Sequence, residues 1–251
     1  MRVFVPVALT ALASTVNAAT FGWDCTNALG TCQNYCFYAQ CRGGAGQQFT
    51  YDSDKSKRAP RRRASGCSRT PCSDTNLSYS SFGNSCDEFP FASTQEGGSG
   101  ARLRCVDSTE NSSMSTLFRD SRKSSPLMHN TVGEGGQLSA FYGTINNGDK
   151  FGITIENWKG APYCENKPSC TNDGGEFFLN PSGNFVDGKR SIAGRGLELD
   201  PGYSIPAARL RRIKTEDGSE HLVIAEDDAN PLKAGDEIWS ARRNATLKIV
   251  D

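Results

Sequence analysis

The sequence lacks a net charge, and this absence limits what the chain as a whole can bind. Its 28 lysines and arginines are balanced by 28 aspartates and glutamates over 251 residues. A histone-like or tail-type nucleic-acid binder needs a strong basic excess, so this class is excluded, although a local basic patch is not. The 26 glycines and 11 prolines are too few for a collagen-like or low-complexity chain.

Histidine is also scarce, which disfavours histidine-based catalysis. The two histidines lie far from any cysteine pair, and the cysteine spacings at 32–36 and 67–72 do not match paired zinc knuckles. A Ser-His-Asp hydrolase lacks support because no Gly-x-Ser-x-Gly motif is present. His221 stands in an alternating apolar run and is interpreted as a sheet residue, whereas His129 lies in a polar segment that could reach a site.

No later stretch of the chain has the 18 consecutive apolar residues typical of a membrane span. Residues 1–18 instead have the pattern of a secretory signal peptide. Arg2 precedes an apolar run from Val3 to Ala13, and small residues end the segment at Ala18. We therefore expect a soluble, secreted, extracellular protein without a membrane partner, and we expect it to be a monomer.

Ten cysteines follow this signal, and an even number in an exported chain indicates a disulfide framework. They are Cys25, Cys32, Cys36, Cys41, Cys67, Cys72, Cys86, Cys105, Cys164 and Cys170. Up to five disulfides are expected, and their connectivity stays open at this point.

The predicted N-terminal segment, residues 19–78, combines these cysteines with a basic run. Apolar and cysteine residues recur at helical spacing between Thr31, a candidate N-cap, and Ala39, which predicts a short helix. Six lysines and arginines lie between Lys55 and Arg63. This stretch is interpreted either as an exposed loop or as a phosphate-contacting patch.

Residues 79–158 have the clearest pattern and are expected to form the catalytic core. Alternation at 101–106 after a glycine-rich turn at 97–100 predicts a hairpin from Phe89 to Val106. Apolar residues at 138, 141, 142 and 145 predict a helix that ends near Asn147, followed by a strand over 150–156. Residues 112–134 are polar and are expected to be a surface insertion. Residues 159–251, with several short β-like runs, are expected to form a β-rich extension packed on the core, so we predict an α+β fold.

Carboxylates around the predicted hairpin are the densest group of candidate catalytic residues. Asp87, Glu88 and Glu96 could supply a base, a metal ligand or a structural anchor, whereas acids beside a turn are often only solvated. Arg102 and Arg104 lie two positions apart on the following strand. Either could clamp a phosphate by paired hydrogen bonds or simply lie on the strand surface.

A long motif runs Cys86-Asp-Glu-Phe-Pro-Phe-Ala-Ser-Thr-Gln-Glu-Gly-Gly98, and it is followed by Glu110-Asn111, Gly136-Gln-Leu138 and Asn147-Gly-Asp-Lys-Phe151. Together these motifs resemble the core of the NucA/NucB family of secreted deoxyribonucleases over residues 80–157. The cysteine-rich lead and the C-terminal third resemble the elaborated fungal members of that family.

The resemblance implies a core similar to the ββα-metal nucleases, in which a hairpin presents the base that activates water and a following helix presents metal ligands. The usual base is histidine, and the residue that matches its replacement by aspartate is Asp87. The resemblance further implies that Asn111 belongs to the metal site, with Glu110 and Gln137 as further candidate ligands, and that Glu96 supports it. Mg²⁺, Mn²⁺ or Ca²⁺ would suit such oxygen ligands.

Two features of the sequence bear on these roles. The chain inserts residues between Asn111 and Gln137 where the family runs on almost directly, which puts the role of Gln137 in doubt. Asn111 also begins an N-glycosylation sequon, as do Asn76 and Asn244. Because a glycan would exclude a metal ligand, we expect Asn111 to be buried and unmodified and the other two to carry glycans.

The leading hypothesis is a secreted, metal-dependent, sequence-nonspecific endonuclease that acts on DNA. It would bind phosphates through basic patches at 55–63, 119–123 and 208–214. A disulfide-stapled, non-enzymatic binding or effector protein is the alternative. A glycosidase with Asp87 and Glu96 as its acid pair is a third hypothesis.

Overall fold

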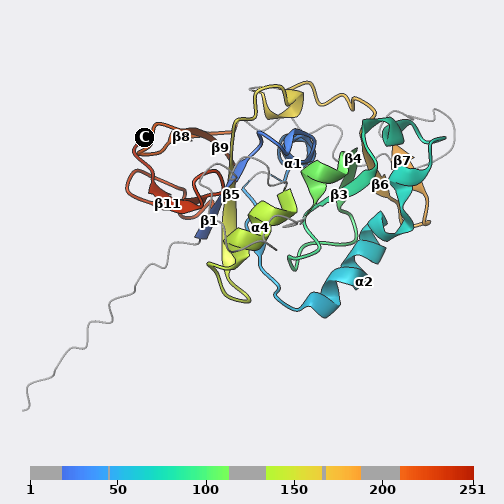
Figure 1. Cartoon of the computed structure of the whole chain (residues 1–251), viewed down its shortest axis with the longest axis horizontal. Helices are drawn as coiled ribbons and strands as arrows, with labels where there is room; N and C mark the ends of the chain where they lie inside the picture. The colour runs from blue at the N-terminus through green and yellow to red at the C-terminus, as the bar shows by residue number, and fades with distance from the viewer. Residues whose placement is uncertain (1–18, 45, 113–133, 166–167, 188–209) are drawn as a thin grey trace, which may run out of the picture.

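The computed structural model describes residues 19–44, 46–112, 134–165, 168–187 and 210–251. Two sheets and the helices packed around them make up this part of the chain, which confirms the α+β class (Figure 1). The strands of the larger sheet are β1 (Ala19–Asp24), β2 (Phe49–Thr50), β5 (Lys150–Glu156), β8 (Arg212–Lys214), β9 (Glu220–Ala225), β10 (Glu237–Ser240) and β11 (Ala245–Lys248). Those of the smaller sheet are β3 (Ser85–Phe89), β4 (Arg102–Val106), β6 (Glu176–Leu179) and β7 (Phe185–Asp187).

The larger sheet has the order β11-β10-β1-β5-β9-β8, with β2 paired to β5. Strand β1 is parallel to both β5 and β10, and the other pairings are antiparallel. The predicted strand over 150–156 is confirmed as β5. Strands from all three predicted regions, 19–78, 79–158 and 159–251, therefore share one sheet, and the C-terminal strands complete it at both edges.

The smaller sheet has the order β3-β4-β6-β7 and is antiparallel throughout. Its first two strands form a hairpin whose second strand, β4, agrees with the predicted 101–106, whereas the first strand, β3, lies at Ser85–Phe89 and so ends where the predicted hairpin was expected to begin. In the register of this hairpin, Asp87 lies opposite Arg104 and Cys86 opposite Cys105. Residues 79–112 therefore follow the order strand, strand, helix, which is the order of a ββα motif.

Four α-helices and several short 3-10 turns are described. The α-helices are α1 (Leu29–Cys41), α2 (Lys55–Ser65), α3 (Ser108–Asn111) and α4 (Glu134–Tyr142). The 3-10 turns are η1 (Cys67–Arg69), η2 (Pro71–Ser73), η3 (Ser78–Phe82) and η6 (Pro162–Cys164).

Two helix boundaries correct the sequence-based expectations. Helix α1 begins at Leu29 rather than after Thr31, because the Glu110 carboxylate accepts the Gly30 N–H at 2.7 Å and satisfies the first turn. Helix α4 begins at Glu134 and ends at Tyr142, so it is shifted toward the N-terminus relative to the expected 138–145. The periodicity of apolar residues predicted the positions of both helices, but it did not predict the residues at which each helix begins and ends.

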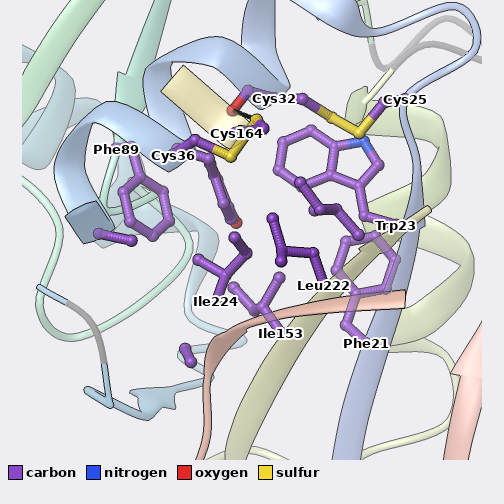
Figure 2. Packing of buried hydrophobic residues seen from close by; sticks show 14 of the residues in the cluster. Phe21, Trp23, Cys25, Cys32, Cys36, Phe89, Ile153, Cys164, Leu222 and Ile224 are labelled. Carbon is purple, nitrogen blue, oxygen red and sulfur yellow. Dashed lines mark hydrogen bonds between the residues drawn. A yellow bond between two sulfur atoms is a disulfide. The ribbon is translucent and has the colours of Figure 1, made fainter. Parts of the chain in front are cut away.

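The main core lies between the larger sheet and α1. Alternation along β1 turns Phe21 and Trp23 toward the helix, where they pack with Ile153, Leu222 and Ile224 (Figure 2). A second, smaller apolar cluster of Ile213, Val223, Ile238 and Ile249 packs elsewhere on the larger sheet. Helix α1 is buried along nearly its whole length and contacts both sheets, so it positions the smaller sheet against the larger one.

Five disulfides use all ten cysteines and resolve their connectivity. The pairs are Cys25–Cys32, Cys36–Cys164, Cys41–Cys170, Cys67–Cys86 and Cys72–Cys105. Two of them tie α1 to the region after β5, and the last two tie the η1–η2 region to the hairpin. Among the described helices, none has both the length and the apolar character needed to span a bilayer.

Candidate active site

Asp87 lies in the middle of β3, and its side chain is almost completely buried, with 3% of its surface exposed. Its Oδ2 accepts a hydrogen bond of 2.9 Å from the Asn34 side chain on α1, and its carboxyl group also hydrogen-bonds that of Glu134 on α4. Burial raises the pKa of Asp87 to about 6, and these two hydrogen bonds limit the rise. Asp87 is thus positioned by helices that lie on either side of it in the sequence.

Glu134, the first residue of α4, was missed by the sequence analysis. It is 4% exposed, and burial together with the negative charge of Asp87 raises its pKa well above the usual range. Two carboxyl groups in contact cannot both ionise without strong repulsion, so the pair favours a state with a single proton, and the higher pKa of Glu134 favours that proton on Glu134. The only sequence signal was an acid at the head of the Gly136-Gln-Leu138 motif.

Several buried oxygen atoms around this pair have no hydrogen-bond partner among the described residues. They include Oδ1 of Asn34, Oε2 of Glu134 and the hydroxyl of Tyr35. The negative charges of Glu134 and Asp87 contribute to the raised pKa of Tyr35, after the larger effect of its burial, so that ring lies close to them. Unpartnered buried oxygens are costly, and their concentration here distinguishes the site from an ordinary packed interior.

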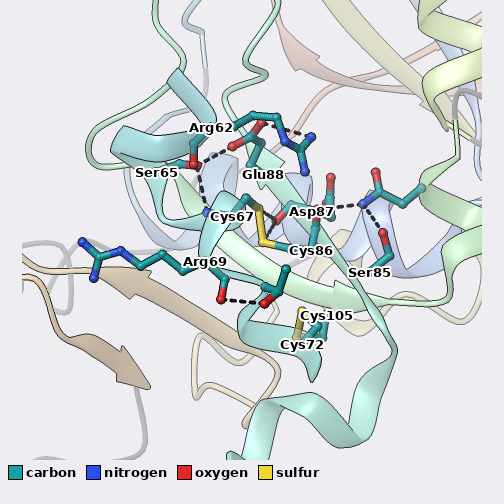
Figure 3. Close-up of a disulfide and its surroundings, with 12 residues drawn as sticks. Arg62, Ser65, Cys67, Arg69, Cys72, Ser85, Cys86, Asp87, Glu88 and Cys105 are labelled. Carbon is teal, nitrogen blue, oxygen red and sulfur yellow. Dashed lines mark hydrogen bonds and ion pairs between the residues drawn. A yellow bond between two sulfur atoms is a disulfide. The ribbon is translucent and has the colours of Figure 1, made fainter. Parts of the chain in front are cut away.

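Glu88 follows Asp87 on β3, and its contacts come from α2. Its carboxylate interacts with the Ser65 hydroxyl and lies 3.5 Å from Nη1 of Arg62, as Figure 3 shows. The Cys67–Cys86 disulfide joins the end of α2 to β3 directly before Asp87. Burial raises the pKa of Glu88, and Arg62 and Ser65 oppose this effect. The basic helix and the candidate catalytic strand are therefore covalently linked.

Asn111 ends α3 beside the start of β3. Its Nδ2 donates to the Ser85 hydroxyl at 3.0 Å and to the Cys86 carbonyl at 2.8 Å. Asn111 is half-buried, so the expectation of a buried residue is wrong. The two bonds made by its amide nitrogen fit an unmodified side chain, which stays a prediction. The other two sequon asparagines, Asn76 and Asn244, are exposed.

Three of the predicted site residues have structural contacts instead. Glu110 caps α1 through Gly30, as described above, and both carboxylate oxygens of Glu96 accept the Thr50 N–H at 3.0–3.1 Å. Gln137 accepts the Asp24 N–H and donates to the Asp24 carbonyl, each at 2.9 Å. The side-chain amide of Gln137 is thus hydrogen-bonded at both its oxygen and its nitrogen. The Glu96 carboxylate accepts a backbone N–H of β2 rather than pairing with Asp87, so the structure does not favour the glycosidase hypothesis, which needs these two acids as a pair.

Arg104 lies opposite Asp87 in the hairpin register, but its guanidinium is occupied by other carboxylates. It donates to Asp173 at 2.8 and 3.2 Å and to Glu176 at 2.6 Å, and only 5% of the residue is exposed. Arg102 lies over the Phe178 ring at 4.4 Å. Arg104 is therefore unavailable to a phosphate, which corrects the predicted clamp, and Arg102 stacks on the neighbouring strand.

His221 is fully buried on β9, as expected for a sheet residue. Its Nδ1 lies 3.2 Å from the Thr154 hydroxyl, and burial lowers its pKa to about 4. It is therefore neutral and belongs to the larger sheet. His129 and the basic patch at 119–123 lie outside the described residues.

Comparison with known proteins agrees with the motif that surrounds Asp87. The sequence model of the Deoxyribonuclease NucA/NucB family matches residues 35–126. The matched segment, called the NucA/NucB region below, is less than half of the chain and is similar to that family of deoxyribonucleases. No curated protein and no solved structure matches the chain. The NucA/NucB region contains α1 from Tyr35 onward, the basic helix α2 and the β3–β4 hairpin. Asn34 lies directly before this region, and Glu134 lies after it.

Proposed function

We propose that this chain is a secreted, metal-dependent endonuclease that hydrolyses the phosphodiester bonds of DNA without sequence specificity. The observation that carries the proposal is the contact between Asp87, in the NucA/NucB region, and Glu134 on α4. Hydrolysis of an anionic phosphodiester needs a base that orients water and positive charge near the phosphate. A buried carboxyl pair that holds one proton can supply the base.

Asp87 is the base in this proposal. With a pKa of about 6 its carboxyl group is mostly ionised at neutral pH, yet it is more basic than an ordinary aspartate. The Asn34 amide holds one carboxylate oxygen in place, and Glu134, as a proton donor, holds the other side of the pair. Asp87 can therefore accept a proton from water without first being reoriented.

The oxygen atoms near Asp87 fit a hard divalent cation such as Mg²⁺, Mn²⁺ or Ca²⁺. Within the described ranges, no group of three or more histidine, cysteine, aspartate or glutamate residues is arranged around a metal position. The ligands would therefore be amide oxygens of Asn34 and Asn111 together with bound waters, while Glu134 keeps its proton beside Asp87. When bound, the cation would offset charge on the phosphate and lower the pKa of a bound water.

The direct test is the nicking of supercoiled plasmid by purified protein in the presence of Mg²⁺, Mn²⁺ or Ca²⁺. We expect Asp87→Asn, which keeps the size of the side chain, to slow nicking about 100-fold or more. Glu134→Gln should also slow it, and EDTA should abolish it. Glu220→Gln, on an exposed edge of β9, is the matched control and should retain full activity.

The proposal is contradicted if the wild-type protein leaves the plasmid intact with all three cations, or if Asp87→Asn nicks as fast as the wild type. Thermal melting of each variant under non-reducing conditions separates a loss of chemistry from a loss of folding.

The proposal also includes export, a monomeric state and N-glycans at Asn76 and Asn244. Five disulfides fit an extracellular protein, because such bonds persist in oxidising compartments. Mass spectrometry of material from the culture medium of a eukaryotic host should find a mature N-terminus at Ala19 and glycans on the two exposed sequons. Recovery of the full-length chain inside the cells only would contradict this part.

A further inference from the structure

The basic run at 55–63 forms a helix, α2, and not an exposed loop. Asp54 caps its start by accepting the Ser56 N–H at 2.9 Å, and Gly66 ends it in the left-handed region with φ of 99°. The Cys67–Cys86 disulfide then fixes its C-terminal end to β3. A helix held at both ends presents its side chains in defined directions, so its six basic residues are not equivalent.

Two of these basic residues pair with one acid beside the helix. Arg61 lies 2.7 Å and Lys57 lies 3.4 Å from Oδ2 of Asp52. Residues four positions apart share a helix face, so these two form one stripe along α2. Their charge is offset by Asp52, and Arg61 also donates to the Ala92 carbonyl. This stripe attaches the helix to the rest of the protein.

Arg58 and Arg62, also four positions apart, form a second stripe along α2, and this stripe contacts β3 at Glu88. The Arg62 side chain is 46% exposed, its Nη1 lies 3.5 Å from Glu88, and its charge acts on both Glu88 and Glu134. The Arg58 charge acts on Tyr142 of α4, as does that of Glu134. The buried Nε of Arg58 has no hydrogen-bond partner within the described part of the chain. The stripe therefore reaches β3 at Glu88, the residue next to Asp87, and its positive charge acts on Glu134 and Tyr142 of α4.

We propose that Arg58 and Arg62 hold the phosphate of the nucleic-acid backbone that is cleaved, beside Asp87 and Glu134. The inference rests on the proposed function and narrows it to two phosphate-positioning residues. A guanidinium binds phosphate oxygens through paired hydrogen bonds, and two of them one helical turn apart match neighbouring phosphate oxygens. Arg62 would exchange its long contact with Glu88 for the phosphate, while Ser65 continues to hold Glu88.

Arg58 and Arg62 would bind the phosphate, the role that the sequence analysis considered for Arg104. Arg104 is held by two carboxylates, whereas Arg62 is half exposed and has one partner at 3.5 Å. A partly exposed ion pair contributes little to stability, so Arg62 can leave Glu88 for a substrate phosphate at a small cost in free energy. Arg63, the next residue, is exposed on a different side of the helix and is the matched control.

The test measures binding and cleavage separately with the full chain. Binding of a fluorescent 20-base-pair duplex is followed by anisotropy in EDTA, where cleavage is blocked, over a series of salt concentrations. We expect Arg58→Ala and Arg62→Ala each to reduce the slope of log affinity against log salt by about 0.9, one phosphate contact each. With a divalent cation present, each change should lower kcat about tenfold or more, because the contact orients the reacting phosphate.

Conservative and control variants separate positioning from bulk charge. Arg62→Lys should restore the salt slope but leave kcat reduced, since lysine keeps the charge and loses the paired geometry. Arg63→Ala should leave kcat unchanged. Equal losses of kcat in Arg63→Ala and Arg62→Ala would overturn the inference, because α2 would then act as a diffuse cationic surface. Unchanged kcat and salt slope in both Arg58→Ala and Arg62→Ala would overturn it as well.

The outcomes also separate this inference from the proposed function. If the wild type cleaves DNA and the arginine variants cleave it equally well, only the assignment of Arg58 and Arg62 fails. If the wild type cleaves no DNA with any cation, the nuclease proposal fails, and with it the assignment of these two residues to a cleaved phosphate. Melting temperatures equal to that of the wild type show that the variants remain folded.

Discussion

The buried position of Arg104 allows the two roles considered for it to be distinguished by a single substitution. In the structure Arg104 neutralises Asp173 and Glu176, which come from the segment around the start of β6. Arg104→Met keeps most of the apolar volume of the side chain and removes its charge. Glu176, with 1% of its side chain exposed, then has no cationic partner, whereas Asp173 is one-third exposed and can be hydrated.

Removal of one partner of a buried ion pair costs about 3–5 kcal/mol, because a charge is left in a poorly solvated position. For a protein of this size such a loss lowers the melting temperature by on the order of 10 °C. The loss depends on pH. Burial raises the pKa of Glu176 to about 7 even though Arg104 opposes it, and without Arg104 the pKa rises further. Protonation of Glu176 then limits the damage at pH 6 more than at pH 8.

The assay is thermal unfolding under non-reducing conditions at pH 6 and pH 8, with plasmid nicking measured in parallel below the melting range. Arg104→Met should melt far below the wild type at pH 8, and the double variant with Glu176→Gln should recover part of the difference. Arg69→Met removes an exposed arginine that donates to the Gly183 carbonyl, and it should have a small effect. An Arg104→Met protein of normal stability that had lost nicking activity would refute the structural role and restore the phosphate clamp.

Periodic patterns in the sequence predicted the elements whose side chains meet the core. Apolar and polar residues alternate along β4 and β5, and these two strands were located from the sequence. Strand β1 was not predicted, although Phe21 and Trp23 alternate on it toward the core. Helix α2 has no such pattern, since Ser65 is its only buried residue. Its stability comes from the Asp54 cap and from the covalent link after Gly66, which a search for periodicity does not detect.

Site residues that lie within one sequence motif could be predicted, whereas those brought together by packing of distant segments could not. The motif identified Asp87 directly. Glu134 was missed because it follows a long insertion, and only the packing of α4 against β1 and α3 brings it to Asp87. Gln137 was chosen on its motif, but its amide binds the backbone of Asp24, 113 residues earlier. Such long-range hydrogen bonds fix the direction of a helix, and they leave no signal in the local sequence.

Further expectations concern the ends of α1 and the titration of the larger sheet. Glu110→Ala should lower the free energy of unfolding, measured in urea, by about 1 kcal/mol, since the Gly30 N–H loses its acceptor. Glu110→Gln should lower it less, because the amide oxygen can still accept this hydrogen bond. Burial and Asp24 raise the pKa of Glu156 to about 7, so the stability it contributes is complete below pH 4.5 and is lost as the pH rises through 7. Glu156→Gln should therefore raise the melting temperature at pH 8 and leave it nearly unchanged at pH 4.5. His221 has the opposite dependence, because its pKa is lowered, and His221→Asn should reduce the loss of stability between pH 6.5 and pH 4.

The extent of the NucA/NucB region indicates which parts of the site require the rest of the chain. Residues 35–126 include Asp87 and α2, but β1, β5 and α4 lie outside them. Without β1 and β5 the apolar face of α1 would have no sheet to pack on, and without α4 Asp87 would lose the carboxyl group that shares its proton. The Cys36–Cys164 and Cys41–Cys170 disulfides also cross this limit. The matched region therefore contains the proposed base and the proposed phosphate-binding helix, while the surrounding strands and α4 hold them in a geometry that can act on a phosphodiester.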